Sequence, residues 1–147
     1  MNRYYTSIEE SKKLIELGLK AESADMWWLY TPAKGDYIAC THEEPDPHYI
    51  NRMKTLYKIT ECAIPCWSVG ALLELMPDVI EYNNKHGYYL DIHKRCPYES
   101  ISDIYIIQYD ANIYNVKPKI AFKSNDLIEC VYQMIVWILK NNYIKTE

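Results

Sequence analysis

Two segments decide the fold class: DIYIIQY at residues 103–109 and DLIECVYQMIVWILK at residues 126–140. The first is dense in β-branched and aromatic residues, which favour strands. The second has apolar residues at helical spacing, and Asp126 with Glu129 suits the start of a helix. Its apolar residues extend nearly all round toward the C-terminal end, which indicates deep burial. The two segments therefore predict a long helix that packs across a sheet.

A second helix is predicted at residues 7–17. Ser7 and Glu10 have the spacing of a capping box, in which each side chain satisfies a backbone N–H group at the helix start. Apolar residues fall mainly on one side of this segment. Gly18 stands where a residue in the left-handed conformation ends many helices.

The other elements are shorter. We predict a central helix that starts at Ser68 and is stopped by Pro77, and strands at residues 37–41, 79–82, 88–93 and 119–123. Residues 26–30, MWWLY, suit a strand or a helix end, and residues 48–61 stay ambiguous despite their helical spacing. Together the elements predict an α+β fold with a small antiparallel sheet of about three to five strands. The N-terminal helix, the short central helix and the long C-terminal helix would pack this sheet.

Length and composition indicate a single domain, residues 1–147, of ordinary globular composition. The net charge of −4 disfavours sequence-independent binding to nucleic acid, which needs a concentrated basic face. Residues 1–10 contain no apolar signal segment, and the apolar run at 127–139 is too short to span a bilayer. We therefore expect a cytoplasmic protein with reduced cysteines and no membrane segment.

Cys66 is the candidate catalytic residue. It lies just before the helix predicted to start at Ser68, where the helix dipole can lower the pKa of a thiol. A base such as His42, His86 or His93 would have to be brought near by the fold. No catalytic signature surrounds Cys66, and the four glycines form no phosphate-binding loop. The sequence therefore favours a protein that is not an enzyme and uses no cofactor, with a small cysteine-dependent enzyme as the alternative.

Cys40, His42, Cys62 and Cys66 are candidate metal ligands, because they are the residue types that bind zinc. Their spacing departs from the paired C-x2-C pattern that marks a zinc site. Free cysteines are also among the most buried residues in proteins. A zinc site is thus an alternative to plain packing of these side chains.

Residues 11–27 resemble a helix-turn-helix in outline, which is the basis for a second alternative, a DNA-binding regulator. A second helix would have to place cationic or amide side chains in the major groove. Residues 21–25, AESAD, contain two acids and no base. These acids would repel phosphate, and a capped helix followed by a turn explains the same residues.

The aromatic content is skewed, with 15 tyrosines and 4 tryptophans against one phenylalanine. Tyrosine suits half-buried strands, and both residue types are enriched at interface hot spots. Trp27, Trp28, Tyr30 and Tyr37 are therefore the candidate binding residues. The alternative is that the tryptophans anchor the N-terminal helix to the sheet. We expect a small interaction module for an unknown protein partner, with self-association through an edge strand left open.

Three regions carry a resemblance: the N-terminal residues 5–11, 14–18 and 24–26, the central residues 64–77 (IPCWSVGALLELMP) and the C-terminal residues 134–144 (MIVWILKNNYI). They resemble a set of small uncharacterised proteins of Bacteroides-type bacteria, their phages and mobile elements. The resemblance covers about half of the chain and omits residues 31–61. It implies an accessory protein of a mobile element in a bacterial cytoplasm, and it assigns no functional residue.

Overall fold

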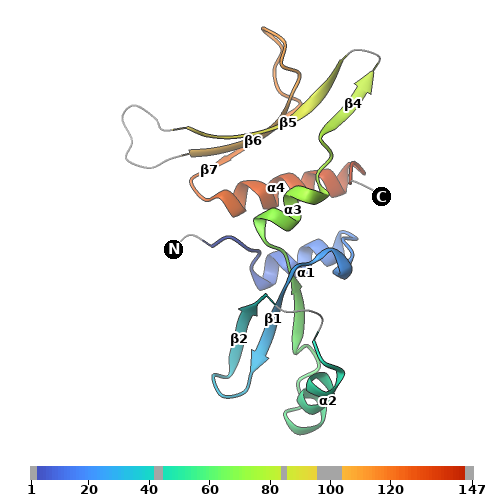
Figure 1. The fold of residues 1–147 in the computed structure, drawn as a ribbon, viewed down its shortest axis with the longest axis vertical. Coiled ribbons are helices and arrows are strands. Elements are labelled where there is room, and N and C mark those ends of the chain that lie inside the picture. Colours follow the sequence, from blue (N-terminus) through green and yellow to red (C-terminus); the bar gives the residue numbers. More distant parts are fainter. Residues whose placement is uncertain (1–2, 42–44, 84–85, 96–103, 145–147) are drawn as a thin grey trace. The chain divides into compact units, whose positions relative to one another are not determined.

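A computed structural model describes residues 3–41, 45–83, 86–95 and 104–144. The fold is α+β, as the sequence predicts. The chain forms two compact units. Figure 1 colours the chain from blue at the N-terminus to red at the C-terminus. We call Tyr5–Ala71 the N-terminal unit, and Leu72–Glu147 with Met1–Tyr4 the C-terminal unit. The expectation that residues 1–147 form one domain stays a prediction.

The helices are α1 (Ile8–Glu16), α2 (Pro47–Leu56), α3 (Val69–Leu75) and α4 (Leu127–Lys140), with a 3-10 turn, η1 (Ala21–Ser23). The strands are β1 (Met26–Thr31), β2 (Asp36–Cys40), β3 (Ala63–Cys66), β4 (Val79–Asn83), β5 (His86–Arg95), β6 (Ile104–Asp110) and β7 (Ile120–Ser124). In the described residues these strands form two antiparallel sheets, ordered β2-β1-β3 and β4-β5-β6-β7. The sequence predicts one small sheet, and the structure corrects this to two.

Helix α1 begins and ends as its sequence predicts. The Ser7 hydroxyl accepts from the Glu10 N–H (3.1 Å), and the Glu10 carboxylate accepts from the Ser7 N–H (2.7 Å). At the other end Gly18 has a φ of +99°, and the Leu19 N–H donates to the Leu14 carbonyl (2.9 Å). These contacts satisfy backbone groups that would otherwise lack partners inside the helix.

Strand β3 was not predicted, because Pro65 lies in its middle. The Tyr30 N–H donates to the Cys62 carbonyl next to β3 (2.8 Å), so alternate residues of β1 direct their backbone groups toward β3. Trp27 pairs with Pro65. Trp27 lies three residues before Tyr30, so by the same alternation its backbone groups point away from β3 and toward β2. The proline nitrogen therefore lies at the outer edge of β3, where no ladder hydrogen bond is lost.

Helix α2 resolves the ambiguous segment 48–61. The Asp46 carboxylate accepts from the His48 N–H (2.9 Å), and Pro47 is the first helical residue. Met53 is the buried residue of this helix, and the Tyr49 hydroxyl donates to the Tyr30 carbonyl. This hydrogen bond satisfies a carbonyl of β1 beyond the end of β3.

In the C-terminal unit, α4 packs against β6 and β7 on one face of the four-stranded sheet (Figure 1). The fully buried side chains of this core include Ile107, Tyr109, Ile128, Cys130, Val131, Met134, Ile135 and Ile138. The Tyr109 hydroxyl donates to the Pro77 carbonyl (2.8 Å), and burial raises the pKa of Tyr109 far above its ordinary value. Among the described residues, no helix has the length and apolar character needed to cross a membrane.

Candidate functional site

Successive side chains of β1 lie on opposite faces of the sheet, so the four candidate binding residues do not all share one face. Residues that pair directly across an antiparallel sheet lie on the same face, and successive residues of a strand lie on opposite faces. Tyr37 pairs with Tyr30, and Tyr30 shares a face with Trp28. Trp27 lies on the other face. The structure therefore brings three of the four residues to one face and separates the fourth.

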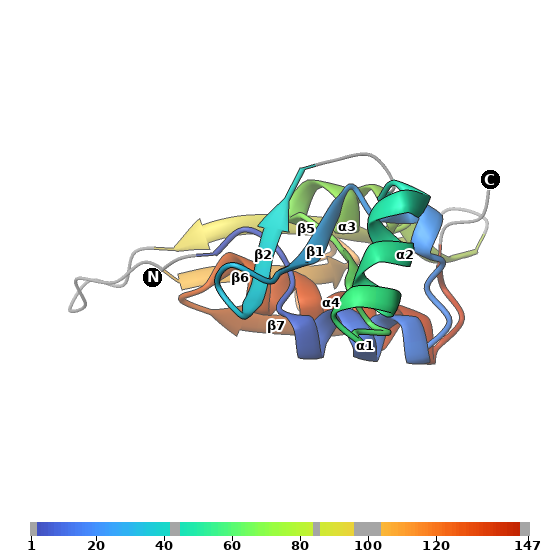
Figure 2. The ribbon, with the colours of Figure 1, turned by 90° about the horizontal axis from the view of Figure 1, so that it is seen from below.

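Trp28 anchors the N-terminal segment to the sheet. Its indole N–H donates to the Thr6 carbonyl (3.0 Å), and its ring meets the Tyr5 ring edge-on with centroids 5.6 Å apart. Helix α1 packs against β3. Figure 2 shows α1 to one side of the strands of this unit. The contacts of Trp28 therefore agree with the alternative that the tryptophans anchor the N-terminal helix to the sheet.

Tyr30 and Tyr37 are also engaged in contacts within the unit. Their rings meet edge-on with centroids 5.5 Å apart, and the Tyr37 hydroxyl donates to the Glu61 carbonyl (2.6 Å). Burial raises the pKa of Tyr37. A partner would compete with these internal contacts, so Trp28, Tyr30 and Tyr37 are poor candidates for its binding surface.

The opposite face of this sheet is apolar and partly exposed. We call it the Trp27 face, and it consists of Trp27, Leu29, Ile38, Cys40, Ala63 and Pro65, which share one side by their register. None of the six is buried, and Ile38 is 38% exposed. The other side of the same strands holds the buried Met26, Ile64 and Cys66. Asp36, which is exposed, stands at one end of the Trp27 face opposite Thr31.

The two free edges of this sheet offer little to an added strand. The backbone groups of Tyr37 point away from β1, because those of its partner Tyr30 point toward β3. At that edge the Tyr37 N–H already donates to the Asp36 carboxylate (2.8 Å). Pro65 places a nitrogen without a hydrogen at the edge of β3. Such devices protect sheet edges from further pairing, so the face is more open to a partner than the edges.

Cys66 is buried, and this removes the accessibility that catalysis would require. Its side chain has no exposed surface, and its thiol donates to the Thr6 carbonyl (3.4 Å). The Thr6 hydroxyl in turn contacts the Ser11 hydroxyl (2.7 Å) and accepts from the Trp67 N–H (3.1 Å). These contacts join the N-terminal segment to the end of β3. Cys66 therefore belongs to a packed polar cluster, without the open surface of a reactive thiol.

The candidate metal ligands do not converge. Cys40 pairs with Trp27, whereas Cys66 pairs with the neighbouring Met26, so the two thiols lie on opposite faces of the sheet. Cys62 is buried two residues before Ile64, on the side of Cys66. His42 lies outside the described residues. Within the described ranges, no group of three or more histidine, cysteine, aspartate or glutamate residues is placed to hold a metal ion.

The helix-turn-helix considered as an alternative at residues 11–27 is not formed. After α1 the chain makes only the single 3-10 turn η1, and β1 begins at Met26. Trp27 is thus a strand residue. Asp25 accepts from the N–H of Ser68 (2.9 Å) and from its hydroxyl, at the start of α3. The DNA-binding hypothesis therefore lacks the recognition helix on which it rests.

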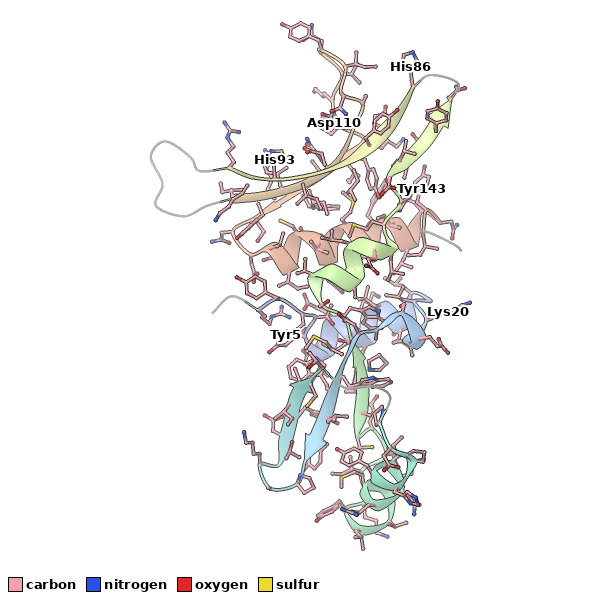
Figure 3. The ribbon with its side chains drawn as sticks, viewed as in Figure 1. Tyr5, Lys20, His86, His93, Asp110 and Tyr143 are labelled. Atoms are coloured by element: carbon pink, nitrogen blue, oxygen red, sulfur yellow. The ribbon has the colours of Figure 1, made fainter. Side chains whose placement is uncertain are left out.

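The face of the C-terminal sheet that carries Asp91 holds a polar network that the sequence did not reveal, beside the apolar Tyr89 and Ile106 on the same face. The His93 ring nitrogen Nδ1 and the Asp91 carboxylate lie 2.9 Å apart, and Gln108 from β6 donates to the same carboxylate oxygen (3.0 Å). Asp91 pairs with Gln108 in the register of β5 and β6. Figure 3 labels His93 on this sheet. A hydrogen-bonded, half-exposed network is what a solvent-facing sheet surface requires.

A turn between β6 and β7 exposes apolar side chains. The Val116 N–H donates to the Ile113 carbonyl (3.1 Å), which closes a β-turn over Tyr114 and Asn115. Asn115 has a φ of +66°, a conformation that asparagine tolerates better than most residues. Ile113, Tyr114 and Val116 are 45%, 91% and 41% exposed. We call residues 113–116 the Tyr114 turn. Sequence analysis did not single it out, because its composition resembles that of an ordinary loop.

Comparison with protein-family models, with curated proteins and with solved structures identifies no similar protein. The function must therefore be argued from the surfaces of the chain itself.

Proposed function

We propose that this chain is a protein-interaction module that binds its partner through the Trp27 face. The observation that carries the proposal is the apolar, unburied side of the sheet β2-β1-β3. A solvent-facing side of an antiparallel sheet ordinarily carries polar residues. Contiguous exposed apolar surface marks interaction sites more often than scattered apolar residues do.

Trp27 is the expected centre of this surface. It lies on the central strand, with Cys40 on one side and Pro65 on the other. Tryptophan is enriched among residues that dominate binding energy, because it removes a large ring from water with little loss of side-chain freedom. Leu29 and Ile38 extend the surface along the strands. The role as a mobile-element accessory protein in a bacterial cytoplasm rests on the sequence resemblance, and belongs to the same proposal.

The test is quantitative co-purification from a nuclease-treated lysate of the source organism with three tagged forms of the chain. These are the natural sequence, Trp27→Ser, and the matched control Leu56→Ser, which removes an apolar side chain that is 70% exposed on α2. We expect a stoichiometric protein partner with the natural chain and with Leu56→Ser. We expect at least about a tenfold loss with Trp27→Ser, the typical effect of a hot-spot tryptophan.

Two readouts make the result decisive. Circular dichroism and thermal unfolding of Trp27→Ser must match the natural chain, so that lost binding is not lost folding. Equal capture by all three forms, or recovery of nucleic acid alone without nuclease treatment, would contradict the proposal. The second of these outcomes would favour the DNA-binding alternative instead.

A further inference from the structure

We infer that the occupant of the Trp27 face is the Tyr114 turn of a second copy of this chain. This inference rests on the proposed function of the Trp27 face and names the partner. The contact would be heterologous, since one copy contributes a sheet face from its N-terminal unit and the other contributes a turn from its C-terminal unit. The first copy would then keep its turn free and the second would keep its face free, so the pair could add further copies at both ends.

The first argument is that both surfaces are apolar and uncommitted in the same chain. Tyr114 is 91% exposed, so its ring has almost no cover from its own chain. Tyrosine in a projecting turn is a favoured anchor, because its rigid ring buries much apolar area and its hydroxyl can stay hydrated. The hydrogen bond from Val116 to Ile113 fixes the turn, so its ordering costs little on binding.

The second argument is size. Neighbouring strands lie about 4.8 Å apart, so a three-stranded face is about 10 Å wide between its outer strands. The first and last Cα atoms of a β-turn lie within about 7 Å of each other. The apolar side chains of the Tyr114 turn therefore match the width of the Trp27 face. The edges of that sheet, which Asp36 and Pro65 protect, do not provide an alternative site for strand addition.

The third argument is charge complementarity. Asp36 stands at one end of the Trp27 face, and its side of the sheet faces solvent. Lys117 directly follows the Tyr114 turn and is exposed. Opposite charges at the rim of a contact fix its orientation more than they add to its affinity. A basic residue next to the apolar turn and an acidic residue next to the apolar face suit a directed contact between copies.

The expected contact is small. A single turn on a three-stranded face buries less than the roughly 1,600 Å² of a standard interface, so dissociation constants on the order of 0.01–1 mM are expected. Because a dimer would keep one free face on one copy and one free turn on the other, association would grow with concentration beyond a dimer.

The experiment is sedimentation velocity with light scattering from about 10 μM to about 1 mM, the range set by the expected affinity. The forms are the natural chain, Tyr114→Ser, Trp27→Ser, Ile38→Lys and the control Leu56→Ser. The natural chain and Leu56→Ser should rise above the monomer mass of 17.4 kDa with increasing concentration. Tyr114→Ser, Trp27→Ser and Ile38→Lys should each remain monomeric alone.

Mixing the variants gives the sharpest result. Tyr114→Ser keeps an intact face and Ile38→Lys keeps an intact turn, so their mixture should form a one-to-one dimer and grow no further. Association of either single variant alone at the level of the natural chain would overturn the inference, as would a mixture that stays monomeric. A natural chain that stays monomeric to about 1 mM would also overturn it. Trp27-dependent capture of a different protein would in that case still support the proposed function.

Discussion

The two sheets of this chain carry different kinds of residues on their open faces. On the C-terminal sheet, the open face carries Asp91, His93 and Gln108, and their polar atoms bond to one another. On the N-terminal sheet, the open face carries Trp27, Leu29 and Ile38. Both sheets have a helix packed on the other side. The first face combines this polar network with a partly exposed Tyr89, whereas the Trp27, Leu29 and Ile38 positions of the second face are all apolar and point to a partner.

The same contrast appears within one strand. Trp27 and Trp28 are neighbours in sequence, and they lie on opposite sides of the sheet. One side is closed by the N-terminal segment, and the other is not. The contrast between a covered face and an open face can therefore be tested by paired changes to residues of similar chemistry.

Thiol labelling gives the largest expected difference between the two faces. Cys40 on the Trp27 face should react with iodoacetamide at the rate of an accessible thiol. Cys66 on the covered face should react slower by roughly 10³-fold or more, because its exposure requires an opening that costs several kcal/mol. Cys130, whose pKa burial raises to about 11, should be equally unreactive. Peptide mapping by mass spectrometry against time at pH 7.5 measures these rates.

A denatured sample is the control, since all of these thiols should then label at similar rates. Labelling of native Cys66 as fast as Cys40 would show that the covered face opens readily, and it would restore the catalytic hypothesis.

Truncation of the two tryptophans gives the next largest difference. Trp28→Ala should reduce the free energy of unfolding by about 3 kcal/mol, because it removes a packed ring and the indole N–H that donates to the Thr6 carbonyl. Trp27→Ala should cost only about 1 kcal/mol, because it removes neither a hydrogen bond nor a ring contact of the kind that Trp28 makes. Urea denaturation of both variants measures the difference, and equal costs would mean that the Trp27 face is itself packed inside the protein.

Local signals made part of this fold predictable. Helix α1 followed from Ser7, Glu10 and Gly18, whose side chains or conformations act within one or two turns of the chain. Helix α4 followed from its apolar periodicity. The prediction of the α+β class was confirmed for the same reason, since the strongest strand and the longest helix are both marked by nearby residues.

Non-local pairing explains what the sequence did not reveal. The sequence did not predict a strand around Pro65, and only its partner Trp27 shows that the missing N–H lies at a free edge. The face on which each aromatic residue lies depends on which strand pairs with β1 and in what register. The Asp91 network joins residues of two different strands, and no local pattern connects them. Of the residues of the Trp27 face, the sequence therefore identified only Trp27 as a candidate binding residue. The structure identified its neighbours Ile38 and Pro65.

The next prediction concerns the edge of the polar sheet. The Tyr143 hydroxyl donates to the Glu81 carboxylate (2.7 Å), and Lys119 lies 3.2 Å from the same oxygen. The Tyr143 hydrogen bond and then Lys119 lower the pKa of Glu81 below its ordinary value of 4.5. Because the folded pKa is lower, this stabilisation is present above pH 4.5 and is lost as the pH falls through the folded pKa.

Glu81→Gln should therefore lower the melting temperature well above pH 4.5 and converge with the natural chain once the pH falls below the folded pKa of Glu81. Tyr143→Phe should have the same pH dependence and keep its ring stacked on Trp137. Glu74→Gln on α3 is the control, as Glu74 is exposed. Thermal unfolding across this pH range measures all four forms, and parallel curves for Glu81→Gln and the natural chain would contradict the assignment.

The smallest effect is expected on the polar face itself. His93 and Asp91 are each 43% exposed in their side chains, so their interaction is well solvated. Their coupling in a double-mutant cycle should be only about 0.2–1 kcal/mol, the usual value for an exposed pair. His93→Ala should also leave the concentration-dependent association of the chain unchanged, whereas Ile38→Lys should abolish it at a similarly small cost in stability. Urea denaturation and sedimentation of both variants separate the two faces, because each change is mild for folding and only one face is expected to bind. If His93→Ala abolished the association, the binding surface would lie on the C-terminal sheet and the Trp27 face would not be the binding site.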